Sequence, residues 1–280
     1  LCGETDSLDT PGDPSGKIRI CSGCGFVHVK ERRGIEEVAN AWDEIYRSGH
    51  YDPQWPGVRA RLFYVSAWCD SHGLLSGRSV LDIGAGDGTF LEFCRQFGAD
   101  PVGMDPGNDN VRKITAKGFT CFHCHASDDA INMGRQFDIV TLLWTLENTA
   151  DCLAVLRYAK RQLKPGGHVV VATGSRILTG FKKPLHRYLP QDPNYPHDTH
   201  CFRWSAGHLQ LAMNRVGLGM LDEKTHGPYL KNDYEDRDEL IIAATSGPEM
   251  VGPPWEFYPE QRGLAKDVFE HFRRWQEKFP

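Results

Sequence analysis

The hydrophobic pattern changes its period at residue 79 and so divides the chain into two kinds of segment. Before it, residues 1–34 carry many turn formers and little apolar periodicity, so burial alone is not expected to hold them together. Residues 35–49 place apolar side chains at helical spacing, which predicts an amphipathic helix. The apolar positions of this helix are Ile35, Val38, Trp42, Ile45 and Tyr46. A second helix is predicted over residues 58–72.

From residue 79 onward, short apolar runs alternate with helical patterns. Strands are predicted at residues 79–84, 100–105, 119–124, 137–144 and 168–173, and helices at 88–98, 108–118, 127–133 and 151–167. This alternation indicates right-handed βαβ units and a parallel sheet covered by helices on both faces. After a long loop, the pattern predicts a helix at 204–217, two β-like runs at 219–226 and 237–246, and an amphipathic helix at 261–279.

The composition is that of an ordinary globular protein, with 25% charged and 40% apolar side chains. The net charge of −5 argues against a nucleic-acid-binding surface, which is usually basic. The longest apolar run, residues 138–146, is shorter than the roughly 18 residues of a membrane span, so no membrane association is expected. Several of the nine cysteines fall inside predicted strands and helices, which favours a reduced, cytoplasmic protein over a disulfide scaffold.

The stretch LDIGAGDGTF, residues 81–90, joins a predicted strand to a predicted helix through a glycine-rich turn. A phosphate-binding loop would need a lysine after its glycines, and none follows. A dinucleotide-binding turn would need a third glycine where Thr89 stands. Asp82 and Asp87 would repel a pyrophosphate, whereas they suit a ligand that carries an ammonium and a sulfonium. Asp105 closes the next strand, where an acid accepts hydrogen bonds from the two hydroxyls of a ribose.

Four motifs in series span residues 79–173: LDIGAGDGTF, GMDP, FDIVTLLWTLENTAD and LKPGGHVVV. In this order and spacing, the chain resembles the class I S-adenosylmethionine-dependent methyltransferases. The resemblance implies an α/β, Rossmann-like fold with a seven-stranded, mostly parallel sheet. The two β-like runs match the antiparallel hairpin that ends such a sheet. The implied cofactor is S-adenosylmethionine.

The resemblance also implies roles for individual residues. Asp82 would orient the amino group of the donor, Asp105 would hold its ribose diol, and Leu143 with Trp144 would flank the sulfonium. The full set implied to bind the cofactor is Asp82, Gly84, Ala85, Gly86, Asp105, Pro106, Ser127, Asp128, Leu143, Trp144 and, from the capping helix, Tyr46. Two of these have structural alternatives: Trp144 as a core side chain, and Asp128 as the cap of the helix that follows.

Two cysteine motifs lead to different predictions. CFHCH, residues 121–125, matches the C-x-x-C-H of haem attachment, but a haem on this predicted strand would collide with neighbouring layers, so none is expected. CSGCG, residues 21–25, lies in the turn-rich segment and is typical of half a zinc knuckle. The predicted ligands of a structural zinc are Cys2, Cys21 and Cys24. The fourth ligand is missing or is His28, and the alternative is a reduced turn without metal.

Several bacterial methyltransferases that act on sugars carry a similar knuckle, followed by helices that cap the donor. The resemblance therefore implies a zinc-knuckle segment at residues 1–34, a helical cap at 35–78, a methyltransferase domain at 79–250 and a helical tail at 251–280. The sugar C-methyltransferases of that group have a large C-terminal domain for which this chain is too short. Transfer to oxygen or nitrogen is therefore expected.

The acceptor is expected beside the long loop after the fifth predicted strand, because ligands of α/β sheets bind beyond the carboxyl ends of the strands. The basic first half of this loop predicts an anionic or sugar-linked small molecule, unless it is only a solvated face. The residues that would bind this acceptor are Lys182, Lys183, His186 and Arg187. The second half supplies candidates for a general base: His200 first, then His197, with Asp198 to orient the imidazole. Relatives often have a histidine where this chain has Asn148, and His200 has a structural alternative as an anchor of the loop.

The sequence thus predicts a cytoplasmic methyltransferase that methylates a hydroxyl of a sugar, a nucleotide sugar or a related small molecule. One alternative is an RNA-base methyltransferase that grips RNA with the knuckle, although residues 1–34 carry no excess of basic side chains. The other alternative is a binding module that kept the fold and lost turnover. The intact glycine turn and Asp105 argue against this second alternative.

Overall fold

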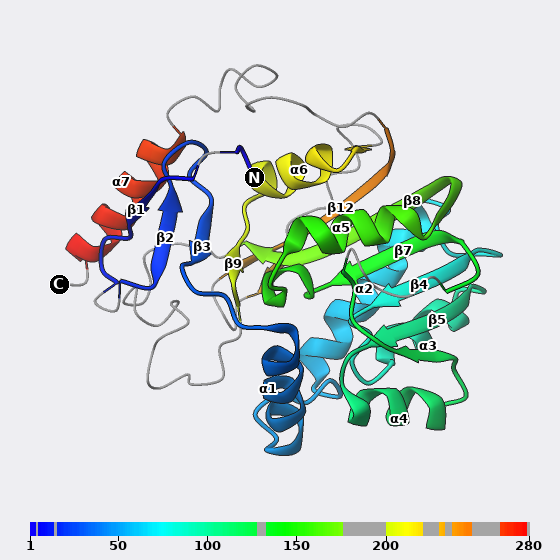
Figure 1. Ribbon diagram of the computed structural model, residues 1–280. Coiled ribbons are helices and arrows are strands. Elements are labelled where there is room, and N and C mark those ends of the chain that lie inside the picture. Colours follow the sequence, from blue (N-terminus) through cyan, green and yellow to red (C-terminus); the bar gives the residue numbers. More distant parts are fainter. Residues whose placement is uncertain are drawn as a thin grey trace.

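A seven-stranded sheet forms the centre of the molecule (Figure 1), with the strands in the order β6-β5-β4-β7-β8-β12-β10. The computed structural model describes residues 1–3, 5–13, 16–127, 133–175, 200–220, 230–232, 237–247 and 264–278. The strands of the sheet are β4 (Ser79–Ile83), β5 (Asp100–Asp105), β6 (Cys121–His123), β7 (Phe137–Leu143), β8 (Leu163–Ser175), β10 (Leu218–Met220) and β12 (Arg237–Ser246). Strand β12 runs antiparallel to β8 and β10, and the short β11 (Leu230–Asn232) pairs with β12.

Helices cover both faces of this sheet. On one face, α2 (Pro56–Ser71) and α3 (Thr89–Gln96) pack on a cluster that includes Val80 and Ile139. On the other, α5 (Cys152–Arg161) and α6 (Ala206–Arg215) pack on a cluster that includes Leu81 and Val140. The side chains of consecutive strand residues thus pack in the cores on opposite faces of the sheet, as the two-residue period of a strand requires. The predicted class I fold is confirmed.

The helix predicted over residues 151–167 is too long, because α5 ends at Arg161 and β8 begins at Leu163. A proline lacks the N–H that a helix needs, so the Pro165 that follows belongs to the strand side of this boundary. A side chain at Gly167 would place its Cβ 2.8 Å from the carbonyl oxygen of Asp138, so only glycine fits against β7 there. The Pro-Gly-Gly sequence is therefore part of the strand and not a stop after the helix.

A second, smaller sheet was not expected from the sequence. It has the order β1-β2-β3-β9 and is built from β1 (Ser7–Asp9), β2 (Ile18–Cys21), β3 (Val27–Val29) and β9 (Phe202–Arg203). Figure 1 shows the C-terminal helix α7 (Leu264–Lys278) lying beside this sheet, away from the central one. Their shared core consists of Ile18, Ile20, Val27, Val29, Val268, Phe272 and Trp275. The N-terminal segment does have a core, and the C-terminal helix supplies three of its seven buried residues.

Helix α1 (Ile35–Arg47) follows the small sheet and lies near α4 (Asn108–Ala116). Both cap helices fall close to their predicted bounds, since α2 covers most of residues 58–72. Only Ile45 of α1 is buried, although the helix has a distinct apolar face. Within the described part of the chain, no helix combines the length and apolar character that crossing a membrane requires.

Candidate active site

The glycine-rich turn follows β4 and takes a conformation that side chains would oppose. Gly84, Gly86 and Gly88 have φ values of 77°, 56° and 81°, in the left-handed region that favours glycine. A Cβ on Gly84 would also come within 2.4 Å of the Thr145 hydroxyl oxygen, which donates to the carbonyl of Ile83. The turn therefore packs closely against the loop after β7. Because its glycines carry no side chains, a ligand can approach the backbone of the turn.

Asp105 ends β5 and reaches back to this turn. Its Oδ2 accepts a hydrogen bond from the Gly86 amide at 2.9 Å, and its Oδ1 accepts from the Gly107 amide at 2.8 Å and from the Asn110 side chain at 3.1 Å. Burial raises the pKa of Asp105 to about 6. The Oδ1 of Asn110 is buried beside this carboxylate and has no hydrogen-bond partner. The site thus holds acceptors that need hydroxyl or ammonium donors from a ligand.

Asp82 lies in β4 directly before the turn, and its side chain is almost fully buried. Its Oδ1 accepts a hydrogen bond of 2.6 Å from the Thr141 hydroxyl on the neighbouring strand β7. Burial raises the pKa of Asp82 to about 7, and the Asp105 charge adds to the effect. A cationic ligand group would stabilise the ionised carboxylate, which agrees with the predicted contact to an ammonium.

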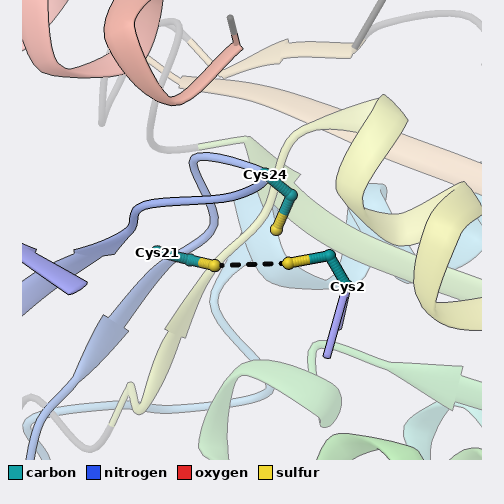
Figure 2. Close-up of side chains that lie close together, drawn as sticks. All are labelled: Cys2, Cys21 and Cys24. Atoms are coloured by element: carbon teal, nitrogen blue, oxygen red, sulfur yellow. Dashed lines mark hydrogen bonds between the residues drawn. The ribbon is translucent and has the colours of Figure 1, made fainter. Parts of the chain in front are cut away.

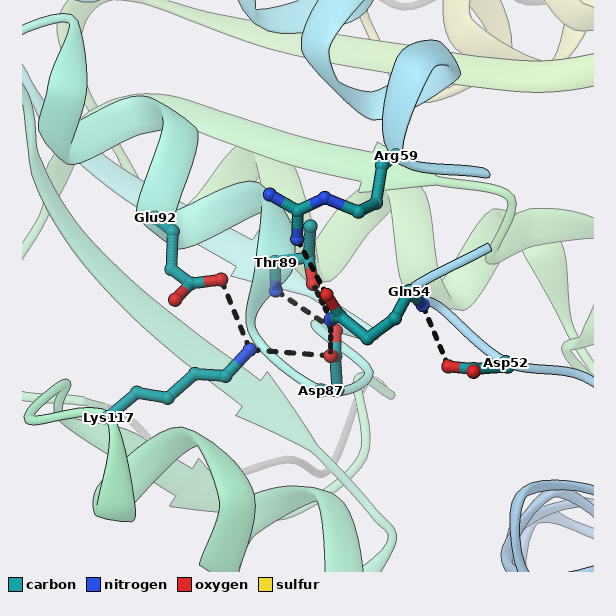
Figure 3. A network of polar contacts seen from close by, with 7 residues as sticks. All are labelled: Asp52, Gln54, Arg59, Asp87, Thr89, Glu92 and Lys117. Atoms are coloured by element: carbon teal, nitrogen blue, oxygen red, sulfur yellow. Dashed lines mark hydrogen bonds and ion pairs between the residues drawn. The ribbon is translucent and has the colours of Figure 1, made fainter. Parts of the chain in front are cut away.

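Asp87, the second acid of the turn, has its hydrogen-bond and ion-pair partners within the protein (Figure 3). It accepts hydrogen bonds from the Thr89 amide at 3.0 Å and the Gln54 side chain at 2.7 Å, and it pairs with Lys117 at 3.3 Å. Burial opposes its ionisation, but these partners together lower the pKa of Asp87. Gln54 in turn accepts from Arg59 on α2 at 2.7 Å. Asp87 therefore anchors the α1–α2 linker to the turn, a role that the sequence did not reveal.

Trp144 follows β7 and has a φ of 52°, which is unusual for a bulky residue and marks local strain. Its backbone is held from both sides: its N–H donates to the Ala172 carbonyl at 2.7 Å, and its carbonyl accepts from the Asn148 side chain at 3.0 Å. The guanidinium of Arg61 lies 4.2 Å from the centre of its ring. Asn148 thus fixes the backbone beside the predicted sulfonium site.

One cavity lies over the turn and collects the predicted donor-binding residues. Those that line it are Asp82, Gly84, Ala85, Gly86, Asp105, Pro106, Ser127, Leu143, Trp144 and Tyr46. The hydroxyl of Tyr46 lies 3.1 Å from where a Cβ on Gly86 would be, so this phenol stands directly over the turn. Asp128 is outside the described residues. The structure thus brings this set together, and the individual contacts to the donor stay predictions.

The cavity also has walls that the sequence did not point out. Four apolar side chains of α1 line it: Ile35, Val38, Ala39 and Trp42. The loop before α5 contributes Asn148 and Asp151, and Asp151 also caps α5 by accepting from the Leu153 and Ala154 amides. Two signals pointed to α1: its amphipathic pattern, which equally fits a helix packed on a protein core, and the resemblance to methyltransferases whose helices cap the donor.

The residues predicted to act on the acceptor lie mostly outside the described part of the chain: Lys182, Lys183, His186, Arg187, His197 and Asp198. His200 is described, and it does not line the cavity. The amide of its neighbour Cys201 donates to the Glu147 carbonyl at 2.6 Å, one residue before the cavity-lining Asn148. His200 therefore lies two residues before β9 and near the residues that border the cavity, and its role as base stays a prediction.

The predicted zinc ligands also come together. Figure 2 shows the side chains of Cys2, Cys21 and Cys24 pointing toward one another, and all three are buried. Their sulfur atoms lie within 4.8 Å of one another, and those of Cys2 and Cys21 are 3.5 Å apart. Hydrogen bonds from Cys2 and Cys24 lower the pKa of the Cys21 thiol, which favours a thiolate in the group.

His28, the suggested fourth ligand, does not belong to this group. Its Nδ1 lies 3.1 Å from the Val29 carbonyl. The nearby imidazole of His208 is buried and also engaged, because its two nitrogens contact the Cys24 carbonyl at 2.8 Å and the Ser205 hydroxyl at 2.8 Å. The described residues therefore offer three thiol ligands and no histidine to complete them.

Comparison with known families settles which kind of domain surrounds the cavity. The model of a family described as "Methyltransferase domain" matches residues 51–223, which is more than half of the chain. The chain belongs to this methyltransferase family. The match includes the glycine turn, Asp105 and the strained Trp144. The matched range begins after α1 and ends before α7, so α1 and most of the small sheet lie outside the matched domain.

Curated relatives of this methyltransferase include ubiquinone biosynthesis O-methyltransferases. The one from Vibrio vulnificus (strain YJ016) is 30% identical over 161 residues, which cover 55% of this chain and 66% of the relative. The one from Pseudomonas aeruginosa is 34% identical over 125 residues, covering 39% and 50%. The chain therefore spans about two thirds or less of the length of these relatives.

Solved structures show the same fold at low sequence identity. The 1,6-didemethyltoxoflavin-N1-methyltransferase of Burkholderia thailandensis, with bound S-adenosylhomocysteine, is 14% identical with a TM-score of 0.60, and the match covers 85% of this methyltransferase and 100% of that chain. The magnesium protoporphyrin IX methyltransferase of Synechocystis PCC 6803, with bound S-adenosylmethionine, is 16% identical with a TM-score of 0.51 and coverage of 74% and 90%. The central sheet and its helices are thus a class I methyltransferase fold.

The residues of the cavity fit S-adenosylmethionine. The donor's ribose hydroxyls match the carboxylate of Asp105 and the buried, unpartnered Oδ1 of Asn110. Its ammonium matches Asp82, whose ionisation burial opposes. The turn at Gly84 and Gly86 leaves room for backbone to approach the ligand, since a side chain there would meet Thr145 or Tyr46.

Proposed function

We propose that this methyltransferase transfers a methyl group from S-adenosylmethionine to a hydroxyl oxygen of a small molecule. The single observation that carries the proposal is the group of Asp82, the glycine turn and Asp105 around one cavity in a methyltransferase domain. The names of the O-methyltransferase relatives support oxygen as the atom that is methylated.

The bound donor supplies an electrophilic methyl carbon on a sulfonium, so that the acceptor oxygen forms the new bond while the carbon–sulfur bond breaks and its electron pair stays on sulfur. The chain's own residues have the task of alignment, which contributes much of the rate in such a displacement. Asp82 and Asp105 hold the two ends of the donor. The strained backbone at Trp144, fixed by Asn148 and Ala172, would position the wall beside the reacting methyl group.

The acceptor hydroxyl must lose its proton, and His200 is the proposed base, with His197 and Asp198 as the alternatives in the same loop. A histidine is suited to this task at neutral pH. The position of His200 beside η1 (Leu146–Asn148) supports it, because η1 borders the cavity. Exchange of His200 for alanine would lower turnover far more than donor affinity, whereas unchanged turnover would remove His200 as the base.

The basic residues of the loop, Lys182, Lys183, His186 and Arg187, predicted an anionic or sugar-linked acceptor, so such compounds are tested beside neutral ones. Labelled donor with a panel of phosphorylated sugars, nucleotide sugars and phenols, read by mass spectrometry, tests the function as a whole. Methylation of any member at oxygen supports the proposal. Donor binding without any methyl transfer would favour the non-catalytic alternative, and salt-sensitive RNA binding with a methylated base would favour the RNA alternative.

We further propose that Cys2, Cys21 and Cys24 bind a structural zinc ion. Zinc–sulfur bonds of about 2.3 Å place tetrahedral ligands about 3.8 Å apart, which agrees with three sulfur atoms within 4.8 Å of one another. Burial of the three thiols excludes solvent from the site. The metal would join the N-terminus to the β2–β3 turn and so stabilise the segment that forms the small sheet.

Metal analysis of the purified chain tests the zinc site independently of activity. We expect about one zinc per chain in the native protein and a loss of most of it in Cys24→Ser. The matched control is Cys94→Ser, which changes an equally buried thiol in α3 and should keep the metal. If Cys24→Ser does not fold, Cys2→Ser gives the same test from the other side of the site. Native protein without zinc after purification in zinc-containing medium would contradict the proposal.

A further inference from the structure

Within the described part of the chain, the apolar face of α1 has no protein core to pack against. Ile35, Val38, Ala39 and Trp42 follow one another at the i, i+3, i+4, i+7 spacing, and we call these four side chains the α1 wall. Each is only partly buried, and none belongs to the hydrophobic clusters of the described structure. An amphipathic helix is normally stabilised by burying this face. All four side chains line the cavity, so a ligand is what would cover them.

The α1 wall adjoins the part of the cavity that suits the donor. Trp42 lies against the rings of Tyr46 and Tyr51, with ring centres 5.6 and 5.8 Å away. Tyr46 stands over Gly86 in the donor turn. At the other end, Arg32, just before α1, donates a hydrogen bond of 2.7 Å to the Ala150 carbonyl in the loop before α5. The wall therefore extends from the donor turn toward this loop.

The charges around the cavity favour a neutral ligand at the wall. Among the described residues that line the cavity there is no lysine and no arginine, while Asp82, Asp87, Asp105 and Asp151 all line it. Asp87 is already paired with Lys117, and Asp82 and Asp105 are assigned to the donor, so the described lining offers no cation that would pair with a phosphate on the acceptor. Aromatic rings such as those of Trp42, Tyr46 and Tyr51 instead favour edge and offset contacts with another ring.

We propose that the acceptor is a neutral phenol with an apolar substituent, and that the α1 wall binds the ring and the substituent. The inference rests on the proposed methyl transfer and narrows its acceptor. The phenolic hydroxyl faces the donor methyl group, and the substituent runs along Val38 toward Ile35. Val38 and Trp42 then determine acceptor specificity, and they do so without contacting the donor's ribose or ammonium.

Calorimetry on the full chain saturated with S-adenosylhomocysteine tests this, with 4-ethylphenol, 4-butylphenol, 4-hexylphenol and glucose 1-phosphate as probes. We expect Kd to fall about fourfold for each added methylene, since burial of one contributes about 0.8 kcal/mol. Glucose 1-phosphate should bind more weakly than 4-hexylphenol. Val38→Asp should weaken 4-hexylphenol at least tenfold and leave the Kd of S-adenosylhomocysteine within about twofold.

The matched control is Asn40→Asp, which adds the same charge on the exposed side of α1 and should leave all phenol affinities unchanged. Val38→Thr keeps nearly the same side-chain size and should also weaken the binding of the phenols, though less than Val38→Asp. This variant serves as the test if Val38→Asp does not fold. Three outcomes would each overturn the proposed acceptor class and leave the methyl transfer untouched. These are equal Kd values for the three phenols, equal effects of Val38→Asp and Asn40→Asp, and tightest binding of glucose 1-phosphate. Absence of S-adenosylhomocysteine binding would instead overturn the proposed methyl transfer.

Discussion

The two ends of the cavity are built by different means. At the donor end, backbone conformation and buried carboxylates form the surface: three left-handed glycines, Asp82 and Asp105, all at the carboxyl edge of the central sheet. At the proposed acceptor end, half-exposed side chains of one helix form the surface, outside the matched methyltransferase domain. The comparison teaches that the shared reagent is bound by the fold itself, whereas the variable partner is bound by an attached helix whose side chains are free to change.

The largest effect should come from a methyl group added at the turn. Gly84→Ala should reduce donor affinity more than 100-fold, because its Cβ would lie within 2.4 Å of Thr145. Gly118→Ala is the matched control: its φ of 78° equals that of Gly84 within a degree, but nothing lies within 4 Å. The control should lose only about 1 kcal/mol of unfolding free energy in urea and keep its donor affinity. Equal losses in both variants would mean that the close approach to Thr145 has no role.

A smaller effect is expected when the charge at the end of β5 is removed. Asp105→Asn should weaken donor binding by roughly 10- to 100-fold, as the loss of hydrogen bonds to a charged group costs about 1.5–3 kcal/mol. Asp100→Asn, at the exposed opposite end of the same strand, should bind the donor normally in the same calorimetric titration. A normal donor Kd in Asp105→Asn would show that the ribose is held elsewhere.

Donor affinity should rise by roughly 10- to 100-fold between pH 5.5 and 7.5. Burial raises the pKa of Asp82 to about 7 and that of Asp105 to about 6, so both must lose protons before they accept from the donor. Because the folded, donor-free chain then binds more protons than the unfolded chain from about pH 4 to 7, its own stability should fall as pH rises through this window. Titrations at several pH values check the affinity, and Asp82→Asn should flatten the profile.

The smallest effect should come from the link between the cap and the turn. Gln54→Ala removes the hydrogen bonds to Asp87 and Thr89, each worth about 1 kcal/mol at most, and should weaken donor binding only a few-fold. It should weaken phenol binding at least as much, because the linker also positions α1. Gln96→Ala, an exposed glutamine at the end of α3, is the control. A larger loss for the donor than for the phenol would contradict the division of the cavity into two ends.

The parts of the molecule that the sequence predicted well are those with local constraints. The glycine turn needs left-handed backbone at Gly84 and Gly86, and the alternation of strand and helix has a period that is visible over a few residues. The same holds for the cysteine pair, because Cys21 and Cys24 lie within one tight turn.

The features that the sequence did not predict depend on contacts between distant segments, which no local pattern encodes. Strand β9 joins a sheet whose other members end at Val29, and Gln54 meets Asp87 across 33 residues. The amphipathic pattern of α1 was recognised, but a pattern records which side is apolar and not what covers it. Asp87 was taken for a ligand group because its charge was visible and its partner Lys117 was not.

The pairing of α7 with the small sheet has a consequence for the order of events during synthesis. The strand residues Ile18 to Val29 leave the ribosome about 240 residues before Phe272 and Trp275. At 5–20 residues per second, their apolar side chains wait roughly 10–50 s for the helix that covers them. During this interval the nascent chain exposes the apolar face of β2 and β3, a surface on which it could associate with other chains before α7 is made.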